Sequence, residues 1–253
     1  MAVYVTGDCH GTYKRFAKER FPEREELCKD DYVIALGDMG LIWSTDPEDM
    51  TEKANIQYLD SLPFTLLFID GNHENFDRLN AMPVEDWNGG KVHRIGKSIY
   101  HLMRGQVYEL QGQKYFTFGG AQSHDIDGGI LDPSDPEFEQ KHYLLYRNSS
   151  KPFRILHESW WPEELPSQEE MKEGWENLVK NDNEIDVILT HCCSSSGQVT
   201  LGGGFFKPDI LTDYLEQVKQ KVSFKRWYFG HYHVERRSSA EEICLHDSIR
   251  RVL

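Results

Sequence analysis

The segment Val3–Gly11, Val-Tyr-Val-Thr-Gly-Asp-Cys-His-Gly, ends a short β-branched run in side chains that bind metals. Asp8 and His10 are two positions apart, so at the end of an extended strand both side chains project to the same side. The flanking glycines, Gly7 and Gly11, allow a tight turn and close backbone approach. The segment therefore predicts a strand whose carboxyl end carries a metal-binding pair.

Four later motifs have the same form, an apolar run followed by polar side chains. They are Tyr32–Leu36 before Gly37-Asp38, Thr65–Ile69 before Gly71-Asn72-His73-Glu74, Ile185–Thr190 before His191, and Trp227–Phe229 before Gly230-His231-Tyr232-His233. Open α/β sheets bind ligands at the carboxyl ends of their strands. We therefore expect all five motifs to converge at one edge, and their oxygen and nitrogen donors suit Mn, Fe or Zn.

The remaining pattern predicts an α/β fold, because helical stretches alternate with strands. These elements are helices over Pro47–Ser61 and Pro208–Lys219, a strand over Ile243–His246, and hairpins formed by Ser98–Met103, Gln106–Leu110 and Lys114–Phe118. Two architectures remain open at this point. One is an ordinary α/β domain with an antiparallel portion, and the other is a two-sheet β-sandwich flanked by helices on both faces.

Residues 121–181 fit neither pattern, within what is otherwise a single domain over residues 1–253. They hold five of the ten prolines, and Glu158–Glu176 has seven acids against one lysine, beside Trp160 and Trp161. A helix is expected near Gln168–Lys180. The stretch is either a solvated excursion or a cap over the active site, since long loops in compact domains are often functional. Its surface also suits a partner or a second copy.

The charge of the chain limits the classes of partner. Among 253 residues, 42 acids and 28 bases give a net charge of −14, which disfavours duplex DNA and anionic membranes. A nucleotide substrate stays open, because bound metal ions supply local positive charge. No apolar run approaches the ~18 residues of a membrane helix. The five cysteines form no CxxC pair, so we expect a reduced, cytoplasmic compartment.

Together the five motifs resemble the calcineurin-like metallophosphoesterase superfamily, whose pattern is Asp-x-His, Gly-Asp, Gly-Asn-His-(Asp/Glu), His and Gly-His-x-His in that order. The resemblance implies a β-sandwich with helices on both outer faces and two divalent metal ions, Mn²⁺, Fe²⁺/Fe³⁺ or Zn²⁺. It implies that one ion is held by Asp8, His10, Asp38 and His233, and the other by Asp38, Asn72, His191 and His231, with Asp38 bridging.

The resemblance is incomplete for one branch of that superfamily, the Ser/Thr protein phosphatases. Their second motif continues Gly-Asp-x-x-Asp-Arg-Gly, whereas this chain has Gly37-Asp38-Met39-Gly40. They also carry Arg before Gly-Asn-His-Glu, where this chain has Asp70. Because two basic phosphate-binding positions are missing, we expect a small phosphate ester, such as a nucleotide, to be a better substrate than a phosphoprotein.

The resemblance also implies roles for side chains beside the metals. His73 is expected to act as the general acid on the leaving oxygen or as a donor to the phosphoryl group. Glu74 is expected to orient a metal ligand or His73. Arg78 lies one helical turn past Glu74, where it either contacts a substrate phosphate or forms a surface salt bridge. His124 follows a strand end and is a second substrate-binding prediction.

Three functions are compatible with these residues. The leading one is a dinuclear metal-dependent phosphoesterase that hydrolyses a small phosphomonoester by direct attack of a metal-bridging hydroxide. The first alternative is a phosphodiesterase acting on a nucleotide, cyclic nucleotide or nucleic acid, because the same metal core serves both reactions. The second is a metal-dependent binding or scaffold protein, which the complete motif set disfavours.

Overall fold

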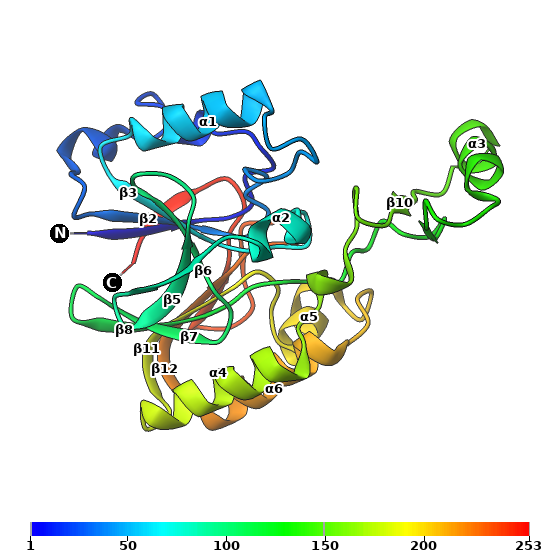
Figure 1. The fold of residues 1–253 in the computed structure, drawn as a ribbon. Helices are drawn as coiled ribbons and strands as arrows, with labels where there is room; N and C mark the ends of the chain where they lie inside the picture. Colours follow the sequence, from blue (N-terminus) through cyan, green and yellow to red (C-terminus); the bar gives the residue numbers. More distant parts are fainter. Residues whose placement is uncertain (1, 149, 253) are drawn as a thin grey trace.

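Two β-sheets lie face to face at the centre of the molecule, with helices on the outer side of each (Figure 1). The computed structural model describes residues 2–148 and 150–252. The architecture confirms the predicted two-sheet sandwich with helices on both faces. None of the described helices is long and apolar enough to cross a membrane.

The first sheet has the strand order β15-β1-β2-β3-β6-β5-β4, in which β1, β2, β3 and β6 are parallel. Its strands are β1 (Val3–Thr6), β2 (Tyr32–Leu36), β3 (Thr65–Ile69), β4 (Val84–Trp87), β5 (Gly90–Arg94), β6 (Ile99–Leu102) and β15 (Ile249–Arg251). Successive residues of β2 are buried on opposite faces of the first sheet. Ile34 packs between the sheets, and Val33 packs under the outer helix. This double burial explains the continuous apolar runs.

The second sheet has the order β13-β14-β12-β11-β8-β7. Its strands are β7 (Gln106–Leu110), β8 (Gln113–Phe118), β11 (Glu184–Thr190), β12 (Ser223–Phe229), β13 (Arg236–Arg237) and β14 (Glu242–Cys244). Val187 and Leu189 of β11 join Ile34 and Leu67 of the first sheet in one buried cluster. That cluster is the inter-sheet core.

Helix α1 (Met50–Asp60) covers the outer face of the first sheet, and α4 (Gln168–Lys180) and α6 (Ile210–Lys221) cover that of the second (Figure 1). Each begins at a side-chain cap: Asp49 accepts from the Glu52 N–H, and Ser167 forms a reciprocal capping box with Glu170. The shorter elements are α2 (Phe76–Asn80), α5 (Ser195–Gly202) and the 3₁₀ turns Lys14–Phe16, Pro22–Glu26 and Pro162–Glu164.

One predicted hairpin is wrong. Strand β6 pairs in parallel with β3, whereas β7 pairs with β8, so the chain crosses between the sheets at the Arg104-Gly105 turn. Arg104 donates from Nε to Asp70 Oδ2 at 2.8 Å, at the end of β3. The next residue, Gly105, donates its N–H to the Thr117 carbonyl of the second sheet. These two contacts tie the turn to both sheets, so β6 and β7 do not form a hairpin. The predicted hairpin of β7 and β8 is confirmed.

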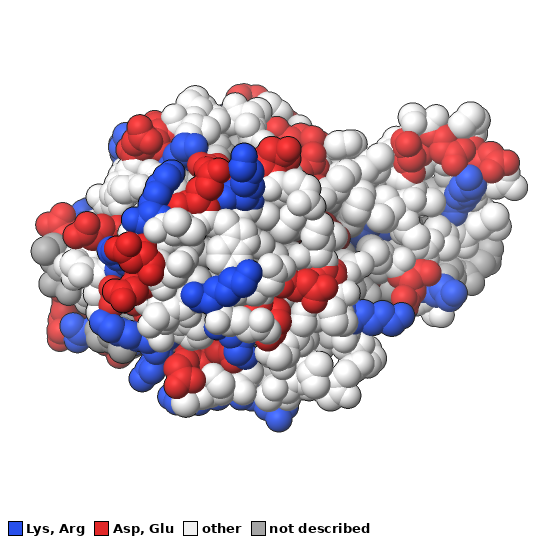
Figure 2. All heavy atoms as spheres, turned by 90° about the horizontal axis from the view of Figure 1, so that it is seen from below, with Lys and Arg blue, Asp and Glu red and all other residues white. Residues whose placement is uncertain are grey.

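Residues 125–161, called the arm below, project from the body and carry α3 (Phe138–Asn148) at the far end (Figures 1 and 2). Two short parallel strands, β9 (Ile130–Leu131) and β10 (Arg154–Ile155), run along it. Helix α4, which falls within the predicted insertion, packs on the second sheet through Leu178. A role of the insertion as a cap stays a prediction.

Candidate metal centre

The five motifs meet where the parallel strands of both sheets end. Strands β1, β2 and β3 are adjacent and parallel, as are β11 and β12, so their carboxyl ends bring the motif residues to one edge of the sandwich. Four of the predicted ligands are almost fully buried there: Asp8, Asp38, Asn72 and His191. Asp8 and His233 are 225 positions apart in the chain and lie 3.0 Å apart here, so the convergence agrees with the prediction.

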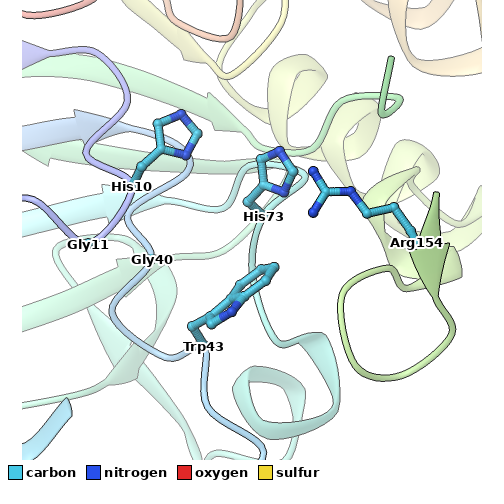
Figure 3. Close-up of a pocket in the computed structure, with 6 residues that line it drawn as sticks. All are labelled: His10, Gly11, Gly40, Trp43, His73 and Arg154. Atoms are coloured by element: carbon cyan, nitrogen blue, oxygen red, sulfur yellow. The ribbon is translucent and has the colours of Figure 1, made fainter. Parts of the chain in front are cut away.

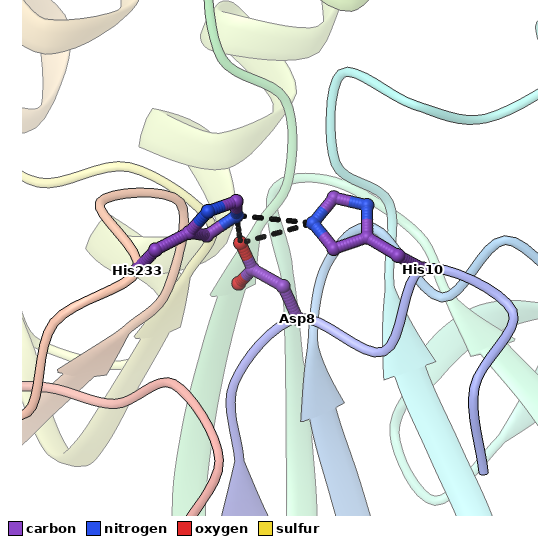
Figure 4. Close-up of side chains that lie close together, drawn as sticks. All are labelled: Asp8, His10 and His233. Carbon is purple, nitrogen blue, oxygen red and sulfur yellow. Dashed lines mark hydrogen bonds and ion pairs between the residues drawn. The ribbon is translucent and has the colours of Figure 1, made fainter.

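One group of possible metal ligands consists of Asp8, His10 and His233 (Figure 4). The distance from His10 Nε2 to His233 Nε2 is 3.0 Å, and that from His233 Nε2 to Asp8 Oδ2 is also 3.0 Å. His10 Nε2 lies 3.8 Å from the same carboxylate oxygen. Two imidazole nitrogens and a carboxylate thus point at one small volume, an arrangement that a divalent cation satisfies.

A second group consists of Asp8, Asp38 and His191, with Asn72 beside it. His191 Nε2 lies 3.4 Å from Asp38 Oδ1 and 3.2 Å from Asn72 Oδ1. The other oxygen of Asp38, Oδ2, lies 3.7 Å from His10 Nε2 in the first group. The two oxygens of Asp38 therefore face different groups, as a bridging ligand requires.

The ring of His191 is oriented by its second nitrogen. Nδ1 donates to the Leu36 carbonyl at 2.6 Å, which leaves Nε2 to face Asp38 and Asn72. Burial disfavours charge on this ring, but the Asp38 carboxylate outweighs burial and raises the pKa of His191. The negative charge of Asp38, which favours a proton at Nε2, would also favour a metal cation there.

The predicted ligand His231 has a different environment. Burial, with a smaller contribution from nearby His191, lowers the pKa of His231 well below its usual value. Its ring is therefore neutral near pH 7, which is the form that binds metals. Its backbone N–H donates to Asp8 Oδ1 at 2.9 Å, so the last motif also fixes the carboxylate of the first.

The backbone of the motifs is strained. Four of the seven predicted ligands have φ between +44° and +66°, a region that favours glycine: His10, Asp38, His231 and His233. Each such residue costs on the order of 1–3 kcal/mol, and such strain is concentrated at functional sites. The strain is consistent with a site in which ligand placement outweighs local backbone preference.

Two motif glycines are required by close approach. A Cβ atom at Gly71 would overlap Oδ1 of Asp38, and a Cβ atom at Gly230 would overlap Oδ1 of Asp8. Glycine at these positions therefore allows the neighbouring loops to pack directly on the carboxylates.

Glu74 supports the loop that carries Asp38. Its Oε1 accepts the Met39 N–H at 2.7 Å, and the N–H of His73 donates to Asp38 Oδ1 at 2.8 Å. Burial and the nearby Asp38 charge raise the pKa of Glu74 well above its usual value. Glu74 thus orients the Asp38 loop through the Met39 N–H.

A cavity of about 370 Å³ opens beside the first group (Figure 3). It is lined by His10, Gly11, Gly40, Trp43, His73 and Arg154. Burial is the main cause that lowers the pKa of His73; the Asp38 carboxylate opposes it, and the charge of Arg154 adds to it. His73 lines this cavity beside the first group of ligands, and its role as a proton donor stays a prediction.

The two predicted substrate-binding residues lie in different places. Arg78 forms a bidentate ion pair with Glu52, with both N···O distances at 2.6 Å, and does not line the cavity. His124 lies at the metal-ligand cluster, where its Nε2 is 3.0 Å from Nε2 of His231 and its ring packs on Phe206. Substrate binding by either residue stays a prediction.

Sequence reasoning missed Arg154 and the position of Trp43 in the cavity. Arg154 lies in a stretch with no motif, and its approach to His73 depends on how the arm folds back at its base. Trp43 belongs to none of the five motifs. An aromatic residue close after a Gly-Asp motif was the one available signal.

Comparison with known proteins agrees with the geometry. The family model described as calcineurin-like phosphoesterase matches residues 1–235. A lariat debranching enzyme from Danio rerio is 26% identical over 152 residues, which cover 54% of this chain. The match spans about a quarter (26%) of that relative's length. With its ordered motifs, its sandwich fold and this match, the chain belongs to the calcineurin-like phosphoesterase family.

Proposed function

We propose that this protein is a dinuclear metal-dependent phosphoesterase that hydrolyses a small phosphomonoester. The observation that carries the proposal is the position of Asp38, whose two oxygens face His10 on one side and His191 on the other. The donors fit a pair of divalent ions, since they are carboxylates, an amide and imidazoles that face a common space. When bound, two such ions supply a hydroxide nucleophile near neutral pH and neutralise phosphoryl oxygens.

The chain's own residues supply the remaining steps. His73 is proposed to donate to the leaving-group oxygen from the cavity side. A phosphate bound beside the ring favours the imidazolium and offsets the effect of burial, so the ring can carry the proton when substrate is present. Glu74, through the Met39 N–H, keeps the Asp38 loop in place.

The substrate proposed is small rather than a phosphoprotein. Asp70 occupies a position where protein phosphatases carry a basic residue, and it forms a buried pair with Arg104 rather than facing the cavity. A phosphodiesterase is the second candidate. The similarity to a lariat debranching enzyme over 152 residues favours it, and the cavity beside His73 leaves room for a second ester substituent.

The test is turnover of 4-nitrophenyl phosphate and bis(4-nitrophenyl) phosphate with Mn²⁺, Fe²⁺ or Zn²⁺. We expect the wild-type protein to hydrolyse at least the monoester, and Asp38→Asn to lose turnover at least a hundredfold. Asp30→Asn makes the same chemical change at an exposed position and serves as the matched control. Metal binding without turnover of either ester would instead support the binding or scaffold role.

A further inference from the structure

The cavity beside His73 differs in charge from the rest of the chain. The chain has 42 acids and 28 bases, yet among the residues that the structure describes no carboxylate lines this cavity, and the Asp125 carboxylate is paired with the lining residue Arg154. Its charged or titratable lining residues are Arg154, His73 and His10. The cavity therefore suits an anion better than the overall charge suggests.

Arg154 is available for such an anion. Its Nε donates to Asp125 Oδ1 at 3.2 Å, and its Nη2 pairs with Asp125 Oδ2. Among the described residues, Nη1 donates to no partner, and the guanidinium points toward His73 (Figure 3). Its side chain is 21% exposed, so it is partly desolvated but open to a ligand. An arginine with a spare donor in a partly dry cavity is a common way to bind phosphate.

The segment that carries Arg154 is anchored to the body. Just after β10, the ring of His157 lies 2.9 Å from Oδ2 of Asp77 in α2, and Nε1 of the buried Trp161 donates to the same oxygen at 2.7 Å. Trp161 also packs edge-on against Trp43, with ring centroids 5.7 Å apart. The base of the arm is therefore held in place, and Arg154 belongs to the site although the rest of the arm projects away.

The second wall of the cavity is aromatic. Trp43 is half-buried, and its ring packs edge-on against His73 at 6.0 Å between centroids. Because His73 is the proposed donor to the leaving group, Trp43 and Arg154 lie on the leaving-group side of the site. An aromatic face beside a guanidinium fits a group that has both a planar ring and a negative charge.

We propose that this cavity is a subsite for a leaving group that is itself a nucleotide, with Arg154 binding its non-scissile phosphate and Trp43 contacting its base. The scissile phosphate would remain at the metal ligands. The assignment of the subsite to the leaving group rests on the proposed function. The arm would then take part in substrate selection through Arg154, which lies where the arm joins the body.

Equilibrium binding tests the subsite without relying on turnover. The probe is the α,β-methylene analogue of ADP, whose carbon bridge prevents loss of the terminal phosphonate, titrated calorimetrically into Mn²⁺-loaded protein. Phenylphosphonate, with one phosphonate and a ring, is the reference ligand. We expect Arg154→Gln to raise the Kd of the nucleotide analogue about tenfold, the effect of losing a charge-assisted hydrogen bond. The Kd of phenylphosphonate should rise by a clearly smaller factor.

Two further variants sharpen the result. Arg154→Lys keeps the charge and should recover part of the affinity for the nucleotide analogue. Arg147→Gln removes an exposed arginine of the same arm, outside the cavity, and should leave both Kd values within twofold of wild type. Unchanged affinity in Arg154→Gln overturns the proposal. Equal weakening of both ligands also overturns it, because Arg154 would then bind the scissile phosphate.

The same proteins separate this proposal from the proposed function. Turnover of 4-nitrophenyl phosphate by the wild type tests the phosphoesterase assignment alone. A tenfold change in nucleotide binding without any ester hydrolysis would support nucleotide binding in the cavity and reject both the phosphoesterase and the leaving-group role. Ester hydrolysis by the wild type, with no selective loss of nucleotide affinity in Arg154→Gln, would support the phosphoesterase and reject the subsite.

Discussion

Nε2 of His10 lies 3.0 Å from Nε2 of His233, although 223 positions separate the two residues in the chain. Both rings also face the Asp8 carboxylate, at 3.8 Å and 3.0 Å. Two imidazole nitrogens at this distance need a shared proton or a shared cation between them. The carboxylate beside them stabilises positive charge at this point, so the pair is the most direct place at which to test metal binding.

We predict that the metal stoichiometry depends differently on His10 and Asp38. His10 belongs to one group of ligands, so His10→Ala should retain about one ion per chain. Asp38 faces both groups, so Asp38→Ala should retain less than one. Elemental analysis of protein purified without chelator measures both, with Asp30→Asn as control. A single site that survives Asp38→Ala would contradict the bridging role.

His73→Ala should retain its metal content but lose rate. The loss should approach ~10²–10⁴-fold on alkyl phosphates, where the leaving oxygen needs a proton, and should be small on 4-nitrophenyl phosphate, whose phenolate leaves unaided. Values of kcat across a series of leaving groups of different pKa measure this. Equal losses across the series would remove His73 from the role of proton donor.

Gly71→Ala should impair metal binding. The added methyl group would overlap both Oδ1 and the backbone nitrogen of Asp38, so Asp38 must shift relative to His191. Metal affinity should fall at least tenfold, measured by calorimetry. Gly112→Ala is the control: Gly112 has φ +71° with no atom near the new Cβ, so strain there should lower stability without changing metal affinity. Equal metal affinity in wild type and Gly71→Ala would show that the loop adjusts freely.

Stability should fall as the pH is lowered from 7 to 5, in part because of His93. Burial, with a smaller contribution from stacked His101, lowers the pKa of folded His93 to about 4, and Asp70 opposes this only weakly. In the unfolded chain His93 has a pKa near 6.5 and binds more protons than in the folded protein. The stability that His93 contributes above about pH 6.5 is therefore lost as the pH falls toward 4. Between pH 7 and pH 5 this titration lowers the free energy of unfolding by about 2 kcal/mol.

Urea unfolding at the two pH values measures this effect. His93→Gln cannot titrate, so its stability should change by about 2 kcal/mol less over the same interval than that of wild type. The rest of the acid sensitivity comes from other groups and should be common to both proteins. The same pH dependence in both would exclude His93 as a contributor.

Much of the fold could be predicted from local pattern. Strands Val3–Thr6, Tyr32–Leu36 and Thr65–Ile69 and helix Gln168–Lys180 have the predicted bounds, because double burial requires continuous apolar runs and the helix has a reciprocal capping box. The five motifs at strand ends predicted which side chains would converge. Parallel strands in one sheet end at the same edge, so convergence within each sheet required no knowledge of how the sheets pack. Bringing the motifs after β1, β2 and β3 together with those after β11 and β12 depends on the stacking of the two sheets.

Only the tertiary structure decided which strands share a sheet and what faces the cavity. The Arg104-Gly105 turn is compatible with a hairpin or a crossover, and the buried Asp70 partner, distant in sequence, favours the crossover. Arg154 has no local pattern that places it near His73; contacts of its neighbours with Asp77 do so. Periodicity and spacing report which face of an element is buried, whereas pairing between elements depends on side-chain contacts that sequence order does not encode.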